Sequence, residues 1–129
     1  MPPNQIPSGG QGGPGRWVAV DEYMSPSARD YQAAVTGAPP NSGYAATDPV
    51  TGNDVVFDGY SNGVLIDAKD RYAQFIDGDR FASWFQGEPA LRDEARRQEQ
   101  AANGTPIEWR FSDQATASFF ASWMTRNGF

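Results

Sequence analysis

The chain has 129 residues, with 10 Lys or Arg, 16 Asp or Glu and a net charge of −6 at pH 7, and this length suits a single domain with one hydrophobic core. It contains no Cys and no His, which excludes disulfides, thiolate zinc sites and every His-based catalytic triad. Any hydrolysis must therefore depend on carboxylates, Lys, Tyr, Ser or Thr, or on a metal bound by oxygen atoms.

The N-terminal segment MPPNQIPSGGQGGPG has low complexity and offers only Ile6 for burial. We expect residues 1–15 to be a flexible linker rich in Pro and Gly, and residues 16–129 to be the folded domain. No apolar run approaches the length of a membrane span, and the N-terminus lacks the charged and apolar segments of a signal peptide. We therefore expect no membrane association, and any export from the cell should use a route that does not depend on a signal peptide.

Helices and strands are predicted in the order helix, strand, strand, helix, strand, helix. The first helix ends at Gly37, and residues 38–53 are expected to be a loop because Pro and Gly are dense there, with a short strand around Tyr44 as the alternative. The runs DVVFDGY and GVLIDAK follow as strands. A second helix runs from Glu88 to Gly104, PIEWRF alternates as a strand with one buried face, and Ser112 caps the last helix. This order predicts an α/β (α+β) fold.

Two helices show a buried stripe in the spacing of their residues. The stripe of the second helix consists of Leu91, Ala95, Gln98 and Ala102. The stripe of the last helix consists of Ala115, Phe119 and Trp123. A buried glutamine must find hydrogen-bond partners, so Gln98 either caps a core carbonyl or orients Lys69 or a substrate phosphate. Gln32, at the edge of the apolar face of the first helix, poses the same choice.

An Asn-Gly pair between the two strand-like runs determines their register. Asn-Gly favours a two-residue hairpin turn in which both residues have φ > 0. With Asn62 and Gly63 in these positions, counting back along the strands brings Asp58 opposite Asp67. The Cβ atoms of the two aspartates are then expected to lie about 5 Å apart.

The two faces of this hairpin should differ, because side chains alternate along a strand. The core face is expected to hold Val55, Phe57, Val64, Ile66 and Ala68. The opposite face is expected to hold Asp58, Asp67 and Lys69. Two carboxylates directly across a ladder destabilise it unless a cation lies between them, and all-oxygen ligation suits Mg²⁺ or Mn²⁺.

Lys69 is the one lysine among the 10 basic residues. A lysine, unlike an arginine, can shift its pKa on burial and handle a proton as well as bind phosphate as a compact charge. Beside two carboxylates, Lys69 would reach a metal-bound water or a scissile phosphate. Another interpretation stays open, in which Asp67 and Lys69 form an exposed strand edge with a weak ion pair.

Asp58, followed by Asp67-Ala68-Lys69 on the next strand and then by a helix, resembles the layout of the PD-(D/E)XK nuclease superfamily. That superfamily has a restriction-endonuclease-like core with a central mixed β-sheet flanked by helices. The segments YQAAVTG, VVFDGYSNGVLIDAKDRYAQF and ARRQEQAANGTPIEWRF are similar to the toxin domains called Tox-REase-5, over roughly residues 28–124. Two departures are Phe57, where Pro is usual, and an end at MTRNGF where a further short strand is expected.

The resemblance implies metal-assisted hydrolysis of phosphodiester bonds, with Mg²⁺ or Mn²⁺ as cofactor and DNA as the expected substrate. Asp58 and Asp67 would bind the metal together with the Ala68 carbonyl, and Lys69 would be the catalytic lysine. The polar helix positions of the catalytic site would be Gln98 and Gln32. The resemblance also implies part of a secreted bacterial effector, as in type VI secretion, that acts in the cytoplasm of the target cell and has a cognate immunity protein.

A non-catalytic interaction or adaptor module on an inactivated nuclease fold is the alternative from another class. The acidic net charge favours it, because binding to nucleic acid ordinarily needs a basic footprint. A local basic strip is nevertheless present on the second helix, formed by Arg92, Arg96 and Arg97. These arginines are also the expected anchors for an acidic immunity protein.

Overall fold

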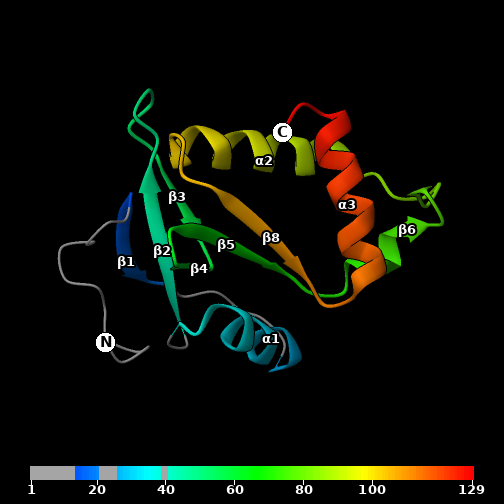
Figure 1. Cartoon of the computed structure of the whole chain (residues 1–129), viewed down its shortest axis with the longest axis horizontal. Coiled ribbons are helices and arrows are strands. Elements are labelled where there is room, and N and C mark those ends of the chain that lie inside the picture. The colour runs from blue at the N-terminus through cyan, green and yellow to red at the C-terminus, as the bar shows by residue number, and fades with distance from the viewer. Residues whose placement is uncertain (1–13, 21–25, 39–40) are drawn as a thin grey trace.

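The computed structural model describes residues 14–20, 26–38 and 41–129. Most of the linker predicted over residues 1–15 lies outside this part of the chain. Within it, the helices flank two small sheets, and a short hairpin lies at one end of the molecule (Figure 1). The predicted α/β class is therefore confirmed.

The helices are α1 (Pro26–Thr36), α2 (Glu88–Ala102) and α3 (Gln114–Arg126). One sheet has the order β1-β2-β3 and consists of β1 (Gly15–Ala19), β2 (Ser42–Thr47) and β3 (Asp54–Phe57). The other has the order β4-β5-β8 and consists of β4 (Gly59–Ser61), β5 (Val64–Lys69) and β8 (Ile107–Phe111). Between β5 and α2 lie the 3-10 helix η2 (Tyr72–Phe75) and the hairpin of β6 (Ile76–Asp77) and β7 (Arg80–Phe81).

β5 is the middle strand of the sheet that carries the predicted site. It pairs antiparallel with β4 and parallel with β8, so this sheet is mixed, as predicted. A parallel pair needs a crossover connection, and α2 supplies it. Asp67 pairs with Trp109 and Lys69 with Phe111, so all four side chains point to the same face of the sheet.

The hairpin between β4 and β5 has the predicted register. Asn62 has a φ of 54° and Gly63 a φ of 79°, as the two-residue turn requires. Gly59 pairs with Ile66, and Ser61 pairs with Val64. The local turn chemistry therefore determines which residues of the two strands face each other.

The first strand-like run is divided at Asp58, which the prediction missed. The residues before Asp58 pair with β2, and those after it pair with β5. Val55 and Phe57 consequently pack in the core cluster of Leu65, and not on the face of Ile66, so the predicted core face was wrong. The alternation of side chains does not continue through a bend at which the chain passes from one sheet to the other.

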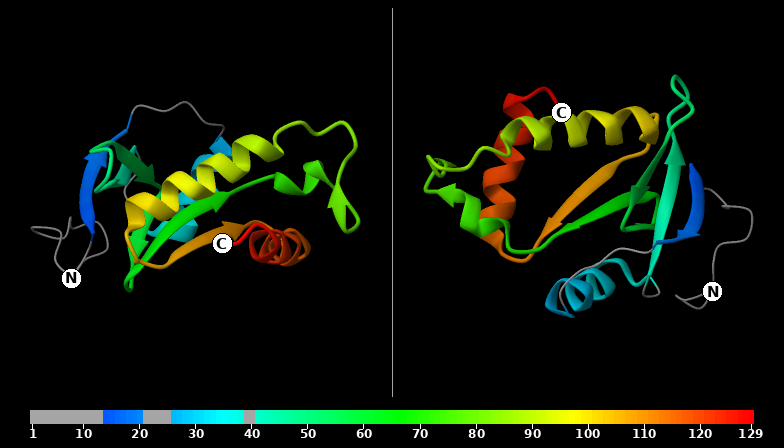
Figure 2. Two further views of the ribbon diagram at one scale, coloured as in Figure 1. Left: turned by 90° about the horizontal axis from the view of Figure 1, so that it is seen from above. Right: turned by 180° about the vertical axis from the view of Figure 1, so that it is seen from behind.

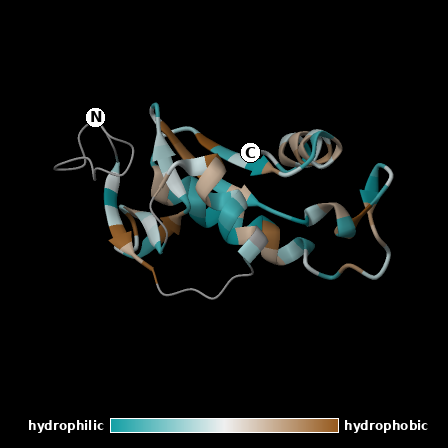
Figure 3. Ribbon diagram, turned by 90° about the horizontal axis from the view of Figure 1, so that it is seen from below, coloured by the Kyte–Doolittle hydropathy of each residue, from teal (hydrophilic) through white to brown (hydrophobic). Residues whose placement is uncertain are grey.

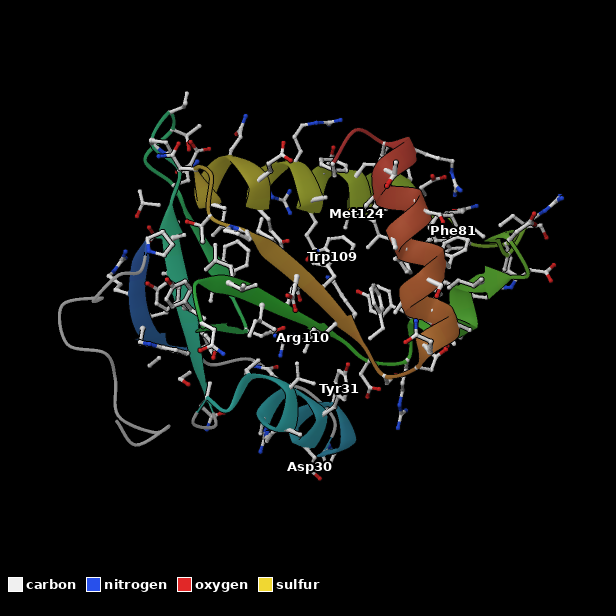
Figure 4. All side chains as sticks on the ribbon, in the orientation of Figure 1. Asp30, Tyr31, Phe81, Trp109, Arg110 and Met124 are labelled. Carbon is white, nitrogen blue, oxygen red and sulfur yellow. The ribbon has the colours of Figure 1, made fainter. Side chains whose placement is uncertain are left out.

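The sheet β4-β5-β8 lies between α1 and α2 (Figure 1 and Figure 2). Apolar and charged residues alternate along β8 (Figure 3). Trp109 points into the space beside α3, and Arg110 points toward α1, where it donates a hydrogen bond to the Val35 carbonyl at 3.0 Å (Figure 4). α1 packs closely because Gly59 has no side chain: a Cβ there would come within 2.7 Å of the Thr36 Cβ. The face that carries Asp67 and Lys69 is thus left to α2 and α3.

α2 confirms the predicted buried stripe. Its buried residues are Leu91, Ala95, Gln98, Ala101 and Ala102. The helix is capped at its C-terminus by Asn103, which has a left-handed φ of 48°, and Gly104 follows. None of the described helices combines the length and the apolar character that a membrane crossing requires.

α3 buries Trp123 as predicted, but the rest of its buried face differs from the predicted stripe. Its buried residues are Thr116, Phe120 and Trp123, while Ala115 is exposed and Phe119 half-buried. The rings of β8 explain the shift, because Phe120 stacks on Phe111 with a centroid distance of 4.8 Å. The spacing of apolar residues alone cannot decide between Phe119 and Phe120, and packing against β8 does.

The N-cap of α3 is Asp113, and the prediction of Ser112 was wrong. The Asp113 carboxylate accepts hydrogen bonds from the Thr116 backbone N–H at 3.0 Å and from the Thr116 hydroxyl at 2.6 Å. Both residue types are good N-caps, and the boundary of a helix is commonly uncertain by one residue in a sequence.

Candidate active site

Asp58 and Asp67 lie in contact where the chain bends between β3 and β4. Asp58 immediately precedes β4, and its carboxylate accepts a hydrogen bond from the Ala68 N–H at 2.7 Å, which holds it beside β5. Burial and the neighbouring Asp67 carboxylate raise the pKa of Asp58 to about 7, although the Ala68 N–H acts in the opposite direction. Two carboxyl groups in such contact resist simultaneous ionisation, and a cation between them would remove the conflict.

Lys69 is buried beneath α2 and is only 4% exposed. Its Nζ lies 2.7 Å from Glu94 Oε1 and 3.1 Å from Asp67 Oδ2. The ammonium also lies over the rings of Trp109 and Tyr72, at 4.4 and 5.4 Å from the ring centroids. The structure therefore excludes the interpretation of Asp67 and Lys69 as an exposed strand edge.

The neighbouring carboxylates stabilise the charged form of Lys69. Burial alone would lower the pKa of Lys69, but the Asp67 and Glu94 carboxylates outweigh it and raise the pKa above its usual range. The structure thus favours a fixed ammonium cation over the proton carrier that burial alone would produce.

Gln98 links Asp67 to β8. Its side-chain amide donates to Asp67 Oδ2 at 2.6 Å and accepts from the Trp109 indole N–H at 2.7 Å. The partners of this buried glutamine are thus Asp67 and Trp109, rather than a core carbonyl or Lys69 as considered from the sequence. Asp67 is thereby held from α2, and the glutamine is held in turn from β8.

Glu94 belongs to the same network, and it was not among the residues predicted from the sequence. It lies four residues before Gln98 on α2, so both side chains reach the same face of the helix. The available signal was a carboxylate one turn away from a glutamine that was already predicted to be buried. Its partner, Lys69, lies 25 positions away in the sequence.

The predicted roles of Gln32 and Ala68 are not tested by the contacts that these two residues make. Gln32 lies on α1, and its backbone carbonyl accepts a hydrogen bond from the Thr36 hydroxyl at 2.8 Å. The network around Asp67 is built without Gln32, whose role stays a prediction. Ala68 contributes its N–H to Asp58, and its carbonyl as a metal ligand also stays a prediction.

The carboxylate pair fits a Mg²⁺ or Mn²⁺ ion that takes further ligands from elsewhere. The described residues contain no group of three or more Asp or Glu side chains that could hold a metal ion. Asp58 and Asp67 would supply two carboxylates, and a backbone carbonyl, water and substrate oxygens would complete the shell. Mg²⁺ is commonly bound in this way, through one or two carboxylates together with substrate phosphates.

A comparison with family models matches residues 28–114 to the family described as Restriction endonuclease fold toxin 5. The matched segment includes both aspartates of the pair, Lys69, Glu94 and Gln98. The comparisons with curated proteins and with solved structures gave no match.

Proposed function

The chain belongs to the family of restriction endonuclease fold toxins described as Restriction endonuclease fold toxin 5, and from this premise we propose that it is a metal-dependent nuclease with DNA as its substrate. The observation that carries the proposal is the contact between Asp58 and Asp67 beside the buried ammonium of Lys69. A pair of carboxylates that resist joint ionisation, next to a fixed cation, suits the binding of a divalent metal and of a phosphodiester.

Asp58 and Asp67 would hold Mg²⁺ or Mn²⁺, with the Ala68 carbonyl as a further ligand. The hydrogen bond from Gln98 fixes the orientation of Asp67, and the Ala68 N–H fixes Asp58. When bound, such an ion lowers the pKa of a water molecule and neutralises charge on the phosphate. The side chains around the pair therefore preorganise the site before the substrate arrives.

Lys69 would stabilise the negative charge that develops on the phosphate. Glu94 holds its ammonium at 2.7 Å. The positive charge is thus fixed beside Asp67 at 3.1 Å without depending on the substrate. Charges that are fixed in advance stabilise a transition state without reorganisation during the reaction.

The description of the family as a toxin supports a biological setting for this activity. We propose that the domain belongs to a secreted bacterial effector and acts in the cytoplasm of the target cell. A producing cell must protect its own genome from such a nuclease, and a cognate immunity protein that binds the domain would provide this protection.

Plasmid cleavage with and without EDTA tests the proposed chemistry. We expect cleavage with Mg²⁺ or Mn²⁺, none with EDTA, and a loss on the order of 100-fold or more in Asp67→Asn. Asp79→Asn is the matched control, because the Asp79 side chain is 95% exposed and should be replaced without effect. Parallel reactions with RNA test the assignment of the substrate.

Two results would contradict the proposal. Full activity in EDTA would exclude a metal-dependent mechanism. A folded protein that cleaves neither DNA nor RNA would exclude nuclease activity. The second result would favour a non-catalytic interaction module on the same fold.

A further inference from the structure

A groove of about 520 Å³ lies between α2 and the segment that joins β2 to β3. One wall consists of residues from the 48–56 segment, and the other consists of Glu94, Arg97, Gln98 and Gln100. The proposed chemistry at Asp58 and Asp67 does not account for this groove.

The groove adjoins the candidate active site through two residues of α2. Gln98 donates to Asp67 at 2.6 Å, and Glu94 accepts from Lys69 at 2.7 Å, and both line the groove. The opposite wall includes Val55 and Val56 of β3, the strand that leads to Asp58. A chain molecule that lies in the groove is therefore brought to the carboxylate pair.

Arg97 differs from the other two arginines of α2. Arg92 pairs with Glu88 at 3.2 Å, and Arg96 pairs with Asp93 at 3.6 Å. Arg97 is exposed and lines the groove, and in the described part of the chain no carboxylate forms an ion pair with it. Of the basic strip on α2, Arg97 is thus the guanidinium available to a ligand in the groove.

The acidic residues of the groove are already engaged. Asp48 accepts from the Val50 N–H at 2.8 Å within its own turn. Asp54 is paired with Arg16 at 2.6 Å, and Glu94 is paired with Lys69 at 2.7 Å. The carboxylates that could repel an anion are therefore partly neutralised or held by other groups.

We propose that this groove binds the sugar-phosphate backbone of the nucleic acid that is cut, and that Arg97 contacts a phosphate outside the scissile bond. The inference rests on the proposed nuclease function and adds a substrate-positioning residue to it. An arginine is the side chain best suited to bind phosphate oxygens in pairs. Thr51, Asn53 and Gln100 line the same groove and add neutral hydrogen-bonding groups of the kind that contact nucleic-acid backbones.

A binding experiment separates this role from catalysis. The affinity of fluorescein-labelled DNA, as duplex and as single strand, is measured by anisotropy over a series of salt concentrations in the Asp67→Asn background with Mg²⁺. Arg97→Gln should weaken binding on the order of tenfold and reduce the slope of log K against log salt by about 1. Arg96→Gln, the same substitution one position away, should stay within about twofold. Melting temperatures establish that both variants are folded.

The same substitutions in the active protein give a second measure. Arg97→Gln should raise KM for DNA with little change in kcat, because a contact outside the scissile phosphate is made equally in the ground and transition states. An equal loss in Arg96→Gln and Arg97→Gln, or unchanged binding in Arg97→Gln, would overturn the groove assignment even when plasmid cleavage is normal. If Arg97→Gln binds DNA as the wild type does, Arg97 would instead be assigned to the binding of an acidic protein partner. Absence of nucleic-acid binding in every variant would overturn both this inference and the nuclease proposal.

Discussion

Replacing Lys69 with Met tests whether the buried ammonium holds the site together. Methionine keeps an unbranched, flexible chain in the same space and removes the charge together with the hydrogen bond to Glu94. The Lys69 side chain is 5% exposed, and its carboxylate partners Asp67 and Glu94 are 12% and 32% exposed. The substitution therefore leaves one nearly buried and one partly buried carboxylate without a counter-charge.

The size of the effect follows from these contacts. Removing one partner of a buried ion pair destabilises a protein by about 3–5 kcal/mol, because the remaining charge stays buried and uncompensated. Gln98 still donates to Asp67, and Glu94 can reach water. We therefore expect a smaller decrease, of about 2–3 kcal/mol, in the free energy of unfolding. For a domain of this size, the decrease corresponds to a fall in Tm of roughly 6–12 °C.

Urea unfolding followed by tryptophan fluorescence, in the presence of EDTA, measures this free energy. Arg80→Met is the control, because the Arg80 side chain is 80% exposed and its replacement should change stability by less than about 0.5 kcal/mol. The double variant Lys69→Met/Glu94→Gln should lose less than the sum of its single variants, since the unpaired carboxylate is gone. A Lys69→Met protein as stable as the wild type would refute the reasoning from buried charge.

Further substitutions test single contacts. Lys69→Arg keeps the charge but places a larger, planar group in an enclosed site. DNA cleavage should therefore fall by about 100-fold. A rate within about twofold of the wild-type rate would show that the lysine has no special role. Gln98→Leu removes the hydrogen-bond partner of a buried carboxylate and of an indole N–H. It should lower the free energy of unfolding in urea by about 2–3 kcal/mol. Gln100→Leu, on the exposed side of the helix, is the control and should change this free energy by less than about 0.5 kcal/mol. Asp113→Ala should lower stability by about 1 kcal/mol, while Ser112→Ala should have little effect; the reverse order of the two would show that the cap of α3 is misplaced.

Local patterns predicted the parts of the fold that depend on neighbouring residues. The Asn62-Gly63 turn set the hairpin register, because a two-residue turn with positive φ admits few other residues. The stripe of α2 was equally visible, including the buried Gln98, because a helix repeats its faces at a constant spacing. These two features placed Asp58, Asp67 and Gln98 among the candidate residues before any tertiary contact was known.

Burial in the core produced a strand that local composition opposed. Residues 38–53 are dense in Pro and Gly and were expected to be a loop, with a strand around Tyr44 only as the alternative, yet β2 lies among them. Tyr44 and Ala46 of this strand are almost completely buried in the cluster of Phe57 and Leu65. Pairing with strands on either side outweighs weak strand propensity, and a window of sequence does not contain those partners.

The sequence by itself predicted the residue types of the candidate site and that the two aspartates meet, because a hairpin is a local structure. Only the tertiary structure decided the state of Lys69 and the membership of Glu94. Lys69 lies 25 positions from Glu94, and Asp67 lies 31 positions from Gln98, so both contacts depend on how α2 crosses the sheet. That crossing converts a strand face predicted to be polar into a buried network. The resulting low exposure, together with two carboxylates, keeps the one lysine of the chain as a fixed cation.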